Sequence, residues 1–219
     1  MVSQGQPIED LLRKGLADEA MNIINEELVI NPDDLQLRVY YGRVKMMKGA
    51  LDEAELIFKS VLVKNNLHVD ANLSLGKMYM IRKMWDDAEK QLELVLRLDS
   101  RNFAALANIA KIYLTRDGNL LKSKEYLLKA REINEKDERI HFDLGMIFFY
   151  NGEDMAGKRS FDEAEALNQN IDHKLIARVY IHYQHFDWAV ASLDKHLDRV
   201  FNSGLPHDSE AELLLAGSL

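Results

Sequence analysis

The sequence of 219 residues contains no cysteine and only three prolines. Without cysteine, thiol catalysis, thiolate metal sites and disulfide bonds are all excluded. Few prolines and 11 glycines leave long stretches without a helix breaker, and hydrophobic residues make up 47% of the chain, enough for a folded core. The composition therefore favours an all-α protein.

Basic residues are outnumbered as well. The chain has 28 Lys and Arg against 36 Asp and Glu, a net charge of -8. Binding to phosphates needs dense Lys and Arg, so this balance argues against nucleic acid as a partner. No apolar run approaches the roughly 18 residues of a membrane span, and the N-terminus lacks the basic and apolar regions of a signal peptide. We therefore expect no membrane span and a cytoplasmic protein, or a periplasmic one if a signal peptide was removed.

Motifs for catalysis are missing too. The sequence has no glycine-rich phosphate loop, nucleophile elbow or metalloprotease helix motif. Acidic pairs such as Asp86-Asp87 fall where helices are expected to begin, and there they favour the helix dipole. His182 and His185 are spaced to share a helical face, but no third ligand stands at a fixed spacing from them. We predict no enzymatic activity, no cofactor and no metal site.

The strongest positive feature is an internal repeat. Small residues recur at Ala20, Ala54, Ala88, Ser123, Gly157 and Ala189, and the successive differences in residue number are 34, 34, 35, 34 and 32. Four positions after each of them, on the same helical face, stands a large apolar residue: Ile24, Phe58, Leu92, Leu127, Phe161 and Leu193. A second series of small residues precedes the first by twelve or thirteen positions: Gly42, Gly76, Ala110, Gly145 and Ala177. The pattern predicts tandem hairpins of two closely packed helices.

Two segments carry the fullest version of this pattern. They are Gly76-x-x-Tyr79 with Trp85-Asp86-Asp87-Ala88, and Leu144-Gly145-x-x-Phe148 with Phe161-x-x-Ala164. Both resemble tetratricopeptide repeats. The resemblance implies a right-handed α-solenoid of about six tandem helix-turn-helix repeats over residues 1–201. The expected units are about 1–34, 35–68, 69–102, 103–137, 138–169 and 170–201.

The two ends of the array depart from the repeat. The first unit is expected to open with a short helix, about Pro7–Lys14, as an incomplete hairpin would. Residues 202–219 are expected to form a linker and a C-terminal capping helix, with Ser209 and Glu212 as its capping box. A seventh, partial repeat is the alternative. Arrays of this kind also stack through uncovered ends, so self-association stays open unless Leu213 and Leu214 form a cap.

In the resembled family, ligands bind a concave groove lined by the first helix of each hairpin. The ninth position of each unit faces that groove, and here it carries Arg43, Lys77, Lys111, Met146 and Arg178. Four of these five are basic in an acidic protein, which favours an acidic peptide or a C-terminal carboxylate as ligand. Ordinary solvated side chains are the alternative. The other groove residues implied by the resemblance are Tyr40, Met47, Leu73, Asn108, Phe149 and Tyr150.

Two further observations qualify the expected ligand. Asn108 offers an amide to a ligand backbone, but the paired asparagines with which some family members clamp chaperone tails are absent. A second candidate interface is Phe186 with Trp188, because exposed tryptophan often marks a contact surface. The alternative places Trp188 beneath the terminal helix.

These features indicate a non-catalytic scaffold or adaptor that binds a peptide segment of another protein within a larger assembly. Two alternatives remain. One is an envelope assembly factor, because type IV pilus pilotins are similar in repeat number and length. The other is a regulatory fragment of a larger protein.

Overall fold

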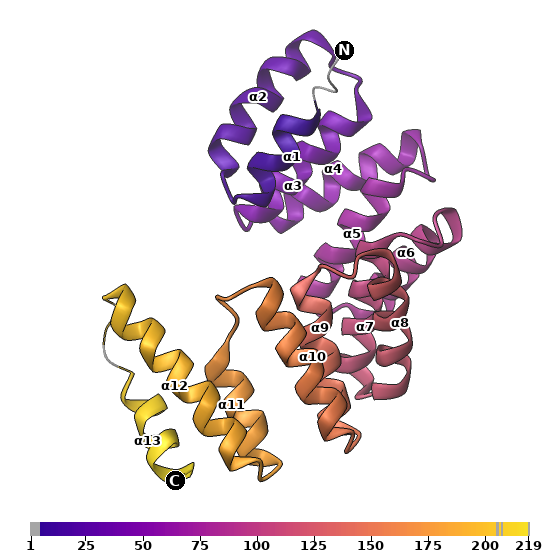
Figure 1. Ribbon diagram of the computed structural model, residues 1–219. Coiled ribbons are helices and arrows are strands. Elements are labelled where there is room, and N and C mark those ends of the chain that lie inside the picture. Colours follow the sequence, from indigo (N-terminus) through magenta and orange to yellow (C-terminus); the bar gives the residue numbers. More distant parts are fainter. Residues whose placement is uncertain (1–4, 205, 207, 219) are drawn as a thin grey trace. The chain divides into compact units, whose positions relative to one another are not determined.

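The computed structural model describes residues 5–204, 206 and 208–218, and within them the chain forms α-helices and no strand. It divides into two compact parts, Met1–Tyr126 and Leu127–Leu219, which we call the N-terminal body and the C-terminal body (Figure 1). The predicted all-α class is confirmed.

The helices follow one another in pairs. The N-terminal body contains α1 (Gly5–Arg13), α2 (Ala17–Ile30), α3 (Leu35–Met47), α4 (Leu51–Lys64), α5 (Val69–Ile81), α6 (Trp85–Leu98) and α7 (Phe103–Asp117). Helix α8 (Leu120–Ile133) begins in this body and ends in the next. The C-terminal body continues with α9 (Glu138–Tyr150), α10 (Asp154–Leu167), α11 (His173–His182), α12 (Phe186–Ser203) and α13 (Ser209–Ser218).

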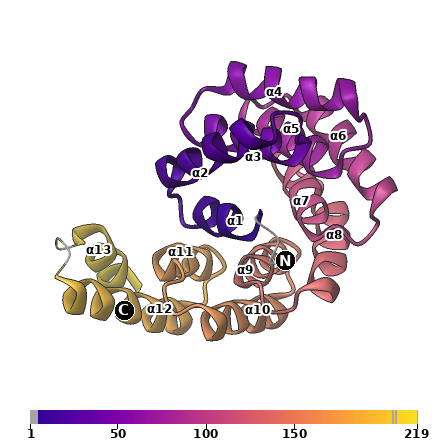
Figure 2. The same cartoon turned by 90° about the horizontal axis from the view of Figure 1, so that it is seen from above.

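Each body has two layers of helices. In the N-terminal body α1, α3 and α5 form one layer and α2, α4 and α6 the other (Figure 2). In the C-terminal body α9, α11 and α13 lie on one side of α10 and α12 (Figure 2). We call the odd-numbered helices the first helices and the even-numbered ones the second helices. The layering is what tandem hairpins stacked in register produce.

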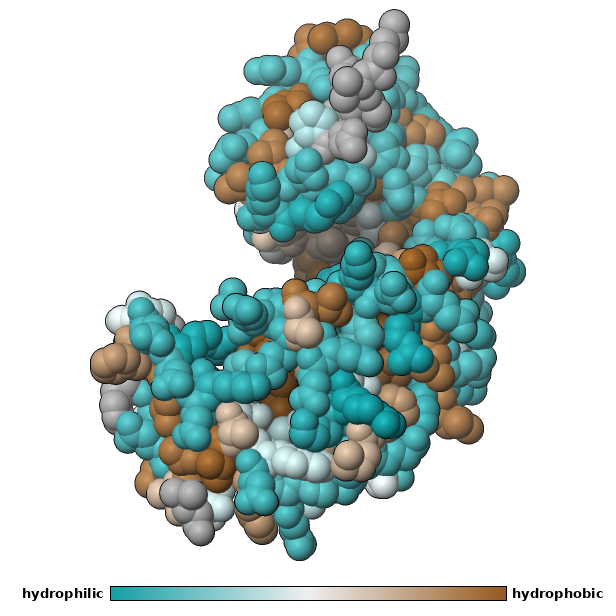
Figure 3. Space-filling view, in the orientation of Figure 1, coloured by the Kyte–Doolittle hydropathy of each residue, from teal (hydrophilic) through white to brown (hydrophobic). Residues whose placement is uncertain are grey.

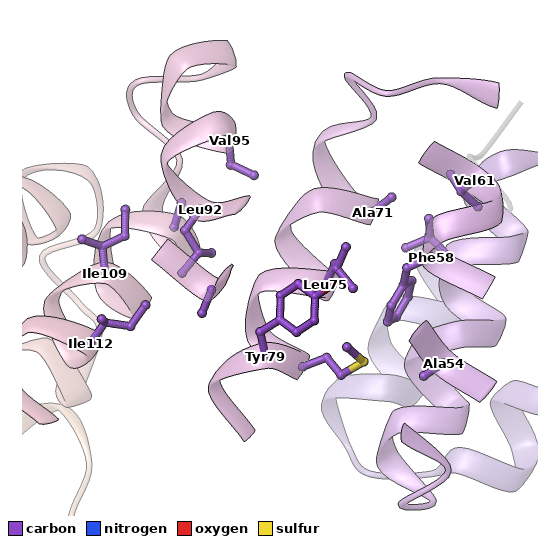
Figure 4. Close-up of a cluster of buried hydrophobic side chains, with 14 of the residues drawn as sticks. Ala54, Phe58, Val61, Ala71, Leu75, Tyr79, Leu92, Val95, Ile109 and Ile112 are labelled. Carbon is purple, nitrogen blue, oxygen red and sulfur yellow. The ribbon is translucent and has the colours of Figure 1, made fainter. Parts of the chain in front are cut away.

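The two predicted series of small residues bring the helices of each hairpin together. A Cβ atom added to Gly42 would lie 2.5 Å from the ring of Phe58, and one added to Gly145 would lie 2.6 Å from the ring of Phe161. Glycine on the first helix therefore makes room for the large apolar residue of the second helix. Figure 4 shows part of this core in the N-terminal body, where Phe58, Leu75 and Leu92 are at most 3% exposed.

The turn inside each hairpin uses a left-handed residue. Residues with positive φ recur at Gly15, Gly49, Lys83, Gly118, Gly152 and Gln184, with nearly the period of the repeat. Lys83 (φ 59°) and Gln184 (φ 64°) adopt this conformation with a side chain, at a cost of about 1–2 kcal/mol each relative to glycine. The turn geometry is thus imposed by the packing of the helices it joins.

Each first helix from α3 onward begins at a side-chain cap. The capping side chains belong to Asp34, His68, Asn102, Asp137, Asp172 and Asp208. For α13 the cap is Asp208, whose Oδ1 accepts from the backbone N–H of Ala211 at 3.0 Å. The N-cap is thus Asp208, one residue before the predicted Ser209, and the helix runs from Ser209 to Ser218. Asp208 thus continues the series of caps found at the other first helices.

Polar side chains fix the turns between hairpins, where the sequence has proline only once. In each case a side chain donates to the backbone carbonyl oxygen six residues before it: Arg38 to Pro32, Asn72 to Asn66, and His141 to Glu135. These hydrogen bonds are 2.7–3.1 Å long. They satisfy turn carbonyls that a regular helix leaves without a partner.

Candidate functional site

The first helices of the N-terminal body are aligned residue for residue. Gln36 on α3 donates from Nε2 to Oδ2 of Asp70 on α5 at 2.9 Å, and these residues are 34 apart. Arg43 and Lys77 stand seven residues, about two helical turns, further along the same two helices. They therefore share the face on which α3 and α5 meet, and Lys111 has the same register on α7. We call Arg43, Lys77 and Lys111 the basic series.

The members of the basic series differ in how they are engaged. Arg43 is half-buried, with Nη1 3.7 Å from Oε1 of Glu9 on α1 and its guanidinium 5.8 Å from the centre of the Tyr40 ring. Lys77 is half-buried. Lys111 is exposed and forms no ion pair among the described residues. A carboxylate of the chain itself thus already lies at one end of the series.

The remaining predicted groove residues of this body range from core to surface. The groove prediction for Tyr40 is wrong, because this residue is 5% exposed and packs in the core cluster with Ile8 and Ile24, where burial raises the pKa of its phenol. Met47 is exposed and Leu73 is half-buried. Asn108 donates from Nδ2 to the carbonyl oxygen of Ala104 at 2.6 Å, so its own helix already takes one of its amide hydrogens.

In the C-terminal body the prediction for Phe149 is wrong. Phe149 is 0% exposed and belongs to the core, with its ring centre 5.7 Å from that of Phe161 and 5.4 Å from that of Tyr180. Met146 is half-buried, and Tyr150 is exposed at the end of α9.

The reason for the burial of Phe149 lies on the next helix. A Cβ atom added to Gly157 would overlap the ring of Phe149, whereas the same position carries alanine in the first three units. Glycine at this position therefore opens the space that the ring fills. This replacement was the signal in the sequence that could have placed Phe149 in the core.

The basic residues of α11 are bound by carboxylates of α13. Lys174 Nζ lies 2.8 Å from Oδ2 of Asp208 and 3.2 Å from Oε2 of Glu210. Arg178 donates from Nη2 to Oε1 of Glu210. Lys174, the backbone N–H of Ala211 and the nearby His196 hold the pKa of Asp208 well below its usual range. Lys174 is also the first cause of the lowered pKa of Glu210.

The second candidate interface lies at the start of α12. Phe186 is exposed, while Trp188 is half-buried. The Trp188 ring stacks on His185 with centres 4.1 Å apart and meets Tyr180 edge to face at 5.5 Å. Lys158 Nζ lies 5.8 Å from the indole centre. A contact role for Phe186 and Trp188 stays a prediction.

Ion pairs between successive hairpins form a second periodic feature, which we did not anticipate. They join the end of a first helix to the start of the preceding second helix: Lys48 to Asp18, Arg82 to Asp52 and Glu55, and Arg116 to Asp86 and Glu89. The bases recur with the period of the repeat, as do their first partners. The equal period of the basic and the acidic residues was the signal in the sequence that could have revealed these ion pairs.

A cleft of about 570 Å³ opens in the C-terminal body between the end of α8, the start of α9 and the end of α10. The side chains that line it include His141, Glu163 and Leu167. His141 Nδ1 lies 2.8 Å from Oε2 of Glu163. Its acidic and basic residues are mixed, so it selects no ligand charge.

His182 and His185 are not arranged as a metal pair. The His182 ring packs on Tyr183 at 4.9 Å, and His185 Nε2 lies 2.6 Å from Oδ2 of Asp154. Over the part of the chain that the structure describes, no group of three His, Asp or Glu side chains is placed to hold a metal ion. Across the same residues, no helix combines the length and the hydrophobicity needed to cross a lipid bilayer.

The sequence matches no protein-family model and no curated protein. Solved structures do resemble it. Pseudomonas aeruginosa PilF has 15% sequence identity and a TM-score of 0.77, over 98% of this chain and 96% of that one. YrrB, a tetratricopeptide-repeat protein with an unusual peptide-binding site, has 19% identity and a TM-score of 0.61, over 80% of this chain and 91% of its own.

The chain of Cut9 in its complex with Hcn1 is longer. The similarity covers 96% of this chain but 41% of that chain, with 16% identity and a TM-score of 0.77. Together these likenesses show that the chain has the tetratricopeptide-repeat fold, as the sequence predicted.

Proposed function

We propose that the chain is a non-catalytic scaffold that binds an acidic segment of another protein on the first helices of its N-terminal body. The basic series is the observation that carries this proposal. Three cations, each one repeat from the next, share one face in a protein of net charge -8, and Lys111 is exposed without an ion pair among the described residues. Such a face attracts carboxylates.

Two contacts within the chain support the chemistry. Glu9 lies against Arg43 at one end of the basic series, and Glu210 lies against Arg178 in the C-terminal body. In both cases a carboxylate from a neighbouring first helix meets the base at the ninth position of a unit. An acidic ligand would repeat this contact at Lys111, and the exposed Met47 on α3 and the half-buried Leu73 on α5 offer adaptable apolar surface.

The test first isolates a partner protein by its binding to the wild-type chain. The affinity of the chain is then measured for that partner and for a synthetic peptide that copies the partner's acidic segment. The triple change Arg43→Glu, Lys77→Glu and Lys111→Glu should weaken binding roughly tenfold to hundredfold. That estimate takes about 0.5–1 kcal/mol for each lost charge pair, with 1.4 kcal/mol per tenfold change in affinity.

A matched control changes net charge equally without touching the first helices. Lys90, Arg97 and Arg101 are exposed in the same body, on α6 and the turn after it. Lys90→Glu, Arg97→Glu and Arg101→Glu together should bind like the wild-type chain. Equal loss in both triples would mean that overall charge, and not this face, governs binding. Unchanged binding in the first triple would contradict the proposal and move the search to Phe186 and Trp188.

An envelope assembly factor is the second candidate function. It is favoured by the likeness to PilF, which extends over almost the whole of both chains. Mass spectrometry of the native protein extracted from its cells would decide, since a membrane-anchored assembly factor should carry lipid at its mature N-terminus. An unmodified N-terminus would count against this candidate.

A further inference from the structure

Helix α13 lies against α12 and reaches the surface of α11 with its acidic end. Ala211 is completely buried there, and Leu214 and Leu215 pack at the edge of the core of this body. Asp208 and Glu210 bind Lys174, and Glu210 also binds Arg178. His196 on α12 adds a fourth contact, from Nε2 to Oδ2 of Asp208 at 2.9 Å. The acidic end of α13 therefore occupies a surface made by Lys174 and Arg178 of α11 and His196 of α12.

That surface has the register of the basic series. Arg178 stands at the ninth position of its unit, as Lys77 does on α5, and Lys174 stands where α5 has Leu73. By charge, α11 is at least as suited to an acidic segment as α5 is. The residues of α11 that would take such a segment are the ones that α13 holds.

We propose that α13 is a tethered internal ligand, which competes with the acidic helical segment of a partner for Lys174 and Arg178. The proposal rests on the proposed function for its chemistry but concerns different residues in the other body. Opening α13 would uncover a second site for an acidic segment. The partner segment should resemble α13, with two carboxylates one turn before a pair of leucines.

The contacts of α13 are suited to opening. Leu213 is 74% exposed, so the apolar contact of α13 rests on Ala211, Leu214 and Leu215. Side chains in the Arg178–Glu210 pair are about half exposed, at 48% and 55%, and ion pairs of that kind are weak in water. What favours the closed state is the tether. Because a short linker joins α13 to α12, the effective concentration of α13 at its site is on the order of millimolar. A free acidic segment therefore binds there well only when the contacts of α13 are weakened.

The experiment compares full-length variants by fluorescence anisotropy with one probe, a fluorescein-labelled peptide of the sequence Asp208–Ser218. The latch variant combines Asp208→Asn with Glu210→Gln. Asparagine keeps the cap of α13, so only charge is removed. A control variant combines Asp194→Asn with Asp198→Asn, two exposed carboxylates of α12. We expect the probe to bind the latch variant at least tenfold more tightly than it binds the wild-type chain or the control.

Adding Lys174→Glu and Arg178→Glu to the latch variant should abolish that binding. Equal affinity for the wild-type chain and the latch variant would overturn the proposal, as would binding that survives the reversal of Lys174 and Arg178. The comparison is therefore made with Arg43→Glu, Lys77→Glu and Lys111→Glu present in every variant, so that probe bound to the basic series does not contribute to the signal. A failure here is thus separate from a failure of the proposed function.

Hydrogen exchange on the wild-type chain provides a test that needs no variant. At saturating probe, the backbone amides of α13 should exchange faster because the helix has been displaced. The amides of α11 should stay protected under the bound probe. Slow exchange in α13 with the probe bound would place the probe elsewhere and overturn the proposal.

Discussion

The two bodies differ at one position that joins successive hairpins, although charged contacts such as Lys195 with Glu165 occur in the C-terminal body as well. In the N-terminal body, Arg82 and Arg116 reach back to carboxylates of the preceding second helix, with the closest Arg116 contact to Glu89 at 2.7 Å. In the C-terminal body Tyr183 holds the same place in its unit and packs on Phe149, with ring centres 5.5 Å apart. One repeat pattern thus fixes the spacing of helices but leaves open which forces join one hairpin to the next.

The difference also shows on the surface. Charged pairs between hairpins are partly solvated and tolerate change, whereas the aromatic cluster around Phe149 and Phe161 is dry and closely fitted. The face of the molecule drawn in Figure 3 is mostly hydrophilic, with hydrophobic side chains in small separate groups. The aromatic cluster lies in the core. We therefore expect it to be more sensitive to substitution than the ion pairs between hairpins.

The largest effect is expected from Phe149→Ala. Removing a fully buried ring should lower the free energy of unfolding of the C-terminal body by about 3–5 kcal/mol. Met80 holds the same position on α5 and is half-buried, so Met80→Ala should cost the N-terminal body less than half as much. The chain has two tryptophans, Trp85 and Trp188, one in each body. Urea titrations that follow Trp188 in a Trp85→Phe background, and the reverse, measure the bodies separately.

A smaller effect is expected from Gly157→Ala, which restores the residue of the earlier units. The new methyl group would overlap the Phe149 ring, at a cost of about 1–3 kcal/mol from overpacking. In the double variant with Phe149→Met the loss should be largely recovered, since methionine occupies that position on α3 and α5. Additive losses in the urea titration would show that the glycine and the ring do not depend on each other.

The smallest effect is expected from Arg82→Met. It breaks the pairs with Asp52 and Glu55 but leaves Lys59 to neutralise Glu55 from 2.7 Å. The N-terminal body should lose about 1 kcal/mol, and less at 1 M salt, where charges are screened. Arg101→Met, at an exposed arginine of the same body, is the control and should change nothing measurable. A loss of equal size at low and high salt would point to packing of the arginine stem instead.

Much of the fold was predictable because packing between the helices of a hairpin is local. Two series of small residues and one of large ones specify the approach of each pair, and all three series are buried where the structure describes them. The cap series and the ion pairs between hairpins were equally periodic. The sequence did not reveal them, because it does not show which residue each Asp or Arg contacts until the stacking of the hairpins is known.

The site was predictable only in part. The register placed the basic series on one face, but it could not distinguish Lys111, which is exposed, from Arg43, which Glu9 engages. It assigned Phe149 to the groove because every unit was taken to expose the same positions. A single glycine on the next helix reverses that assignment, and its effect depends on three-dimensional fit.

The capping side chains at the start of each first helix from α3 onward have a consequence for how the chain folds. A cap such as Asp34 or Asn102 acts on backbone atoms three residues away, so it needs no distant contact in order to favour its helix. Contacts inside a hairpin are also short in sequence, and chains dominated by such contacts fold quickly. Since the signal to begin a helix recurs along the array, no single hairpin has to fold first, and folding can start at several places and spread from each of them.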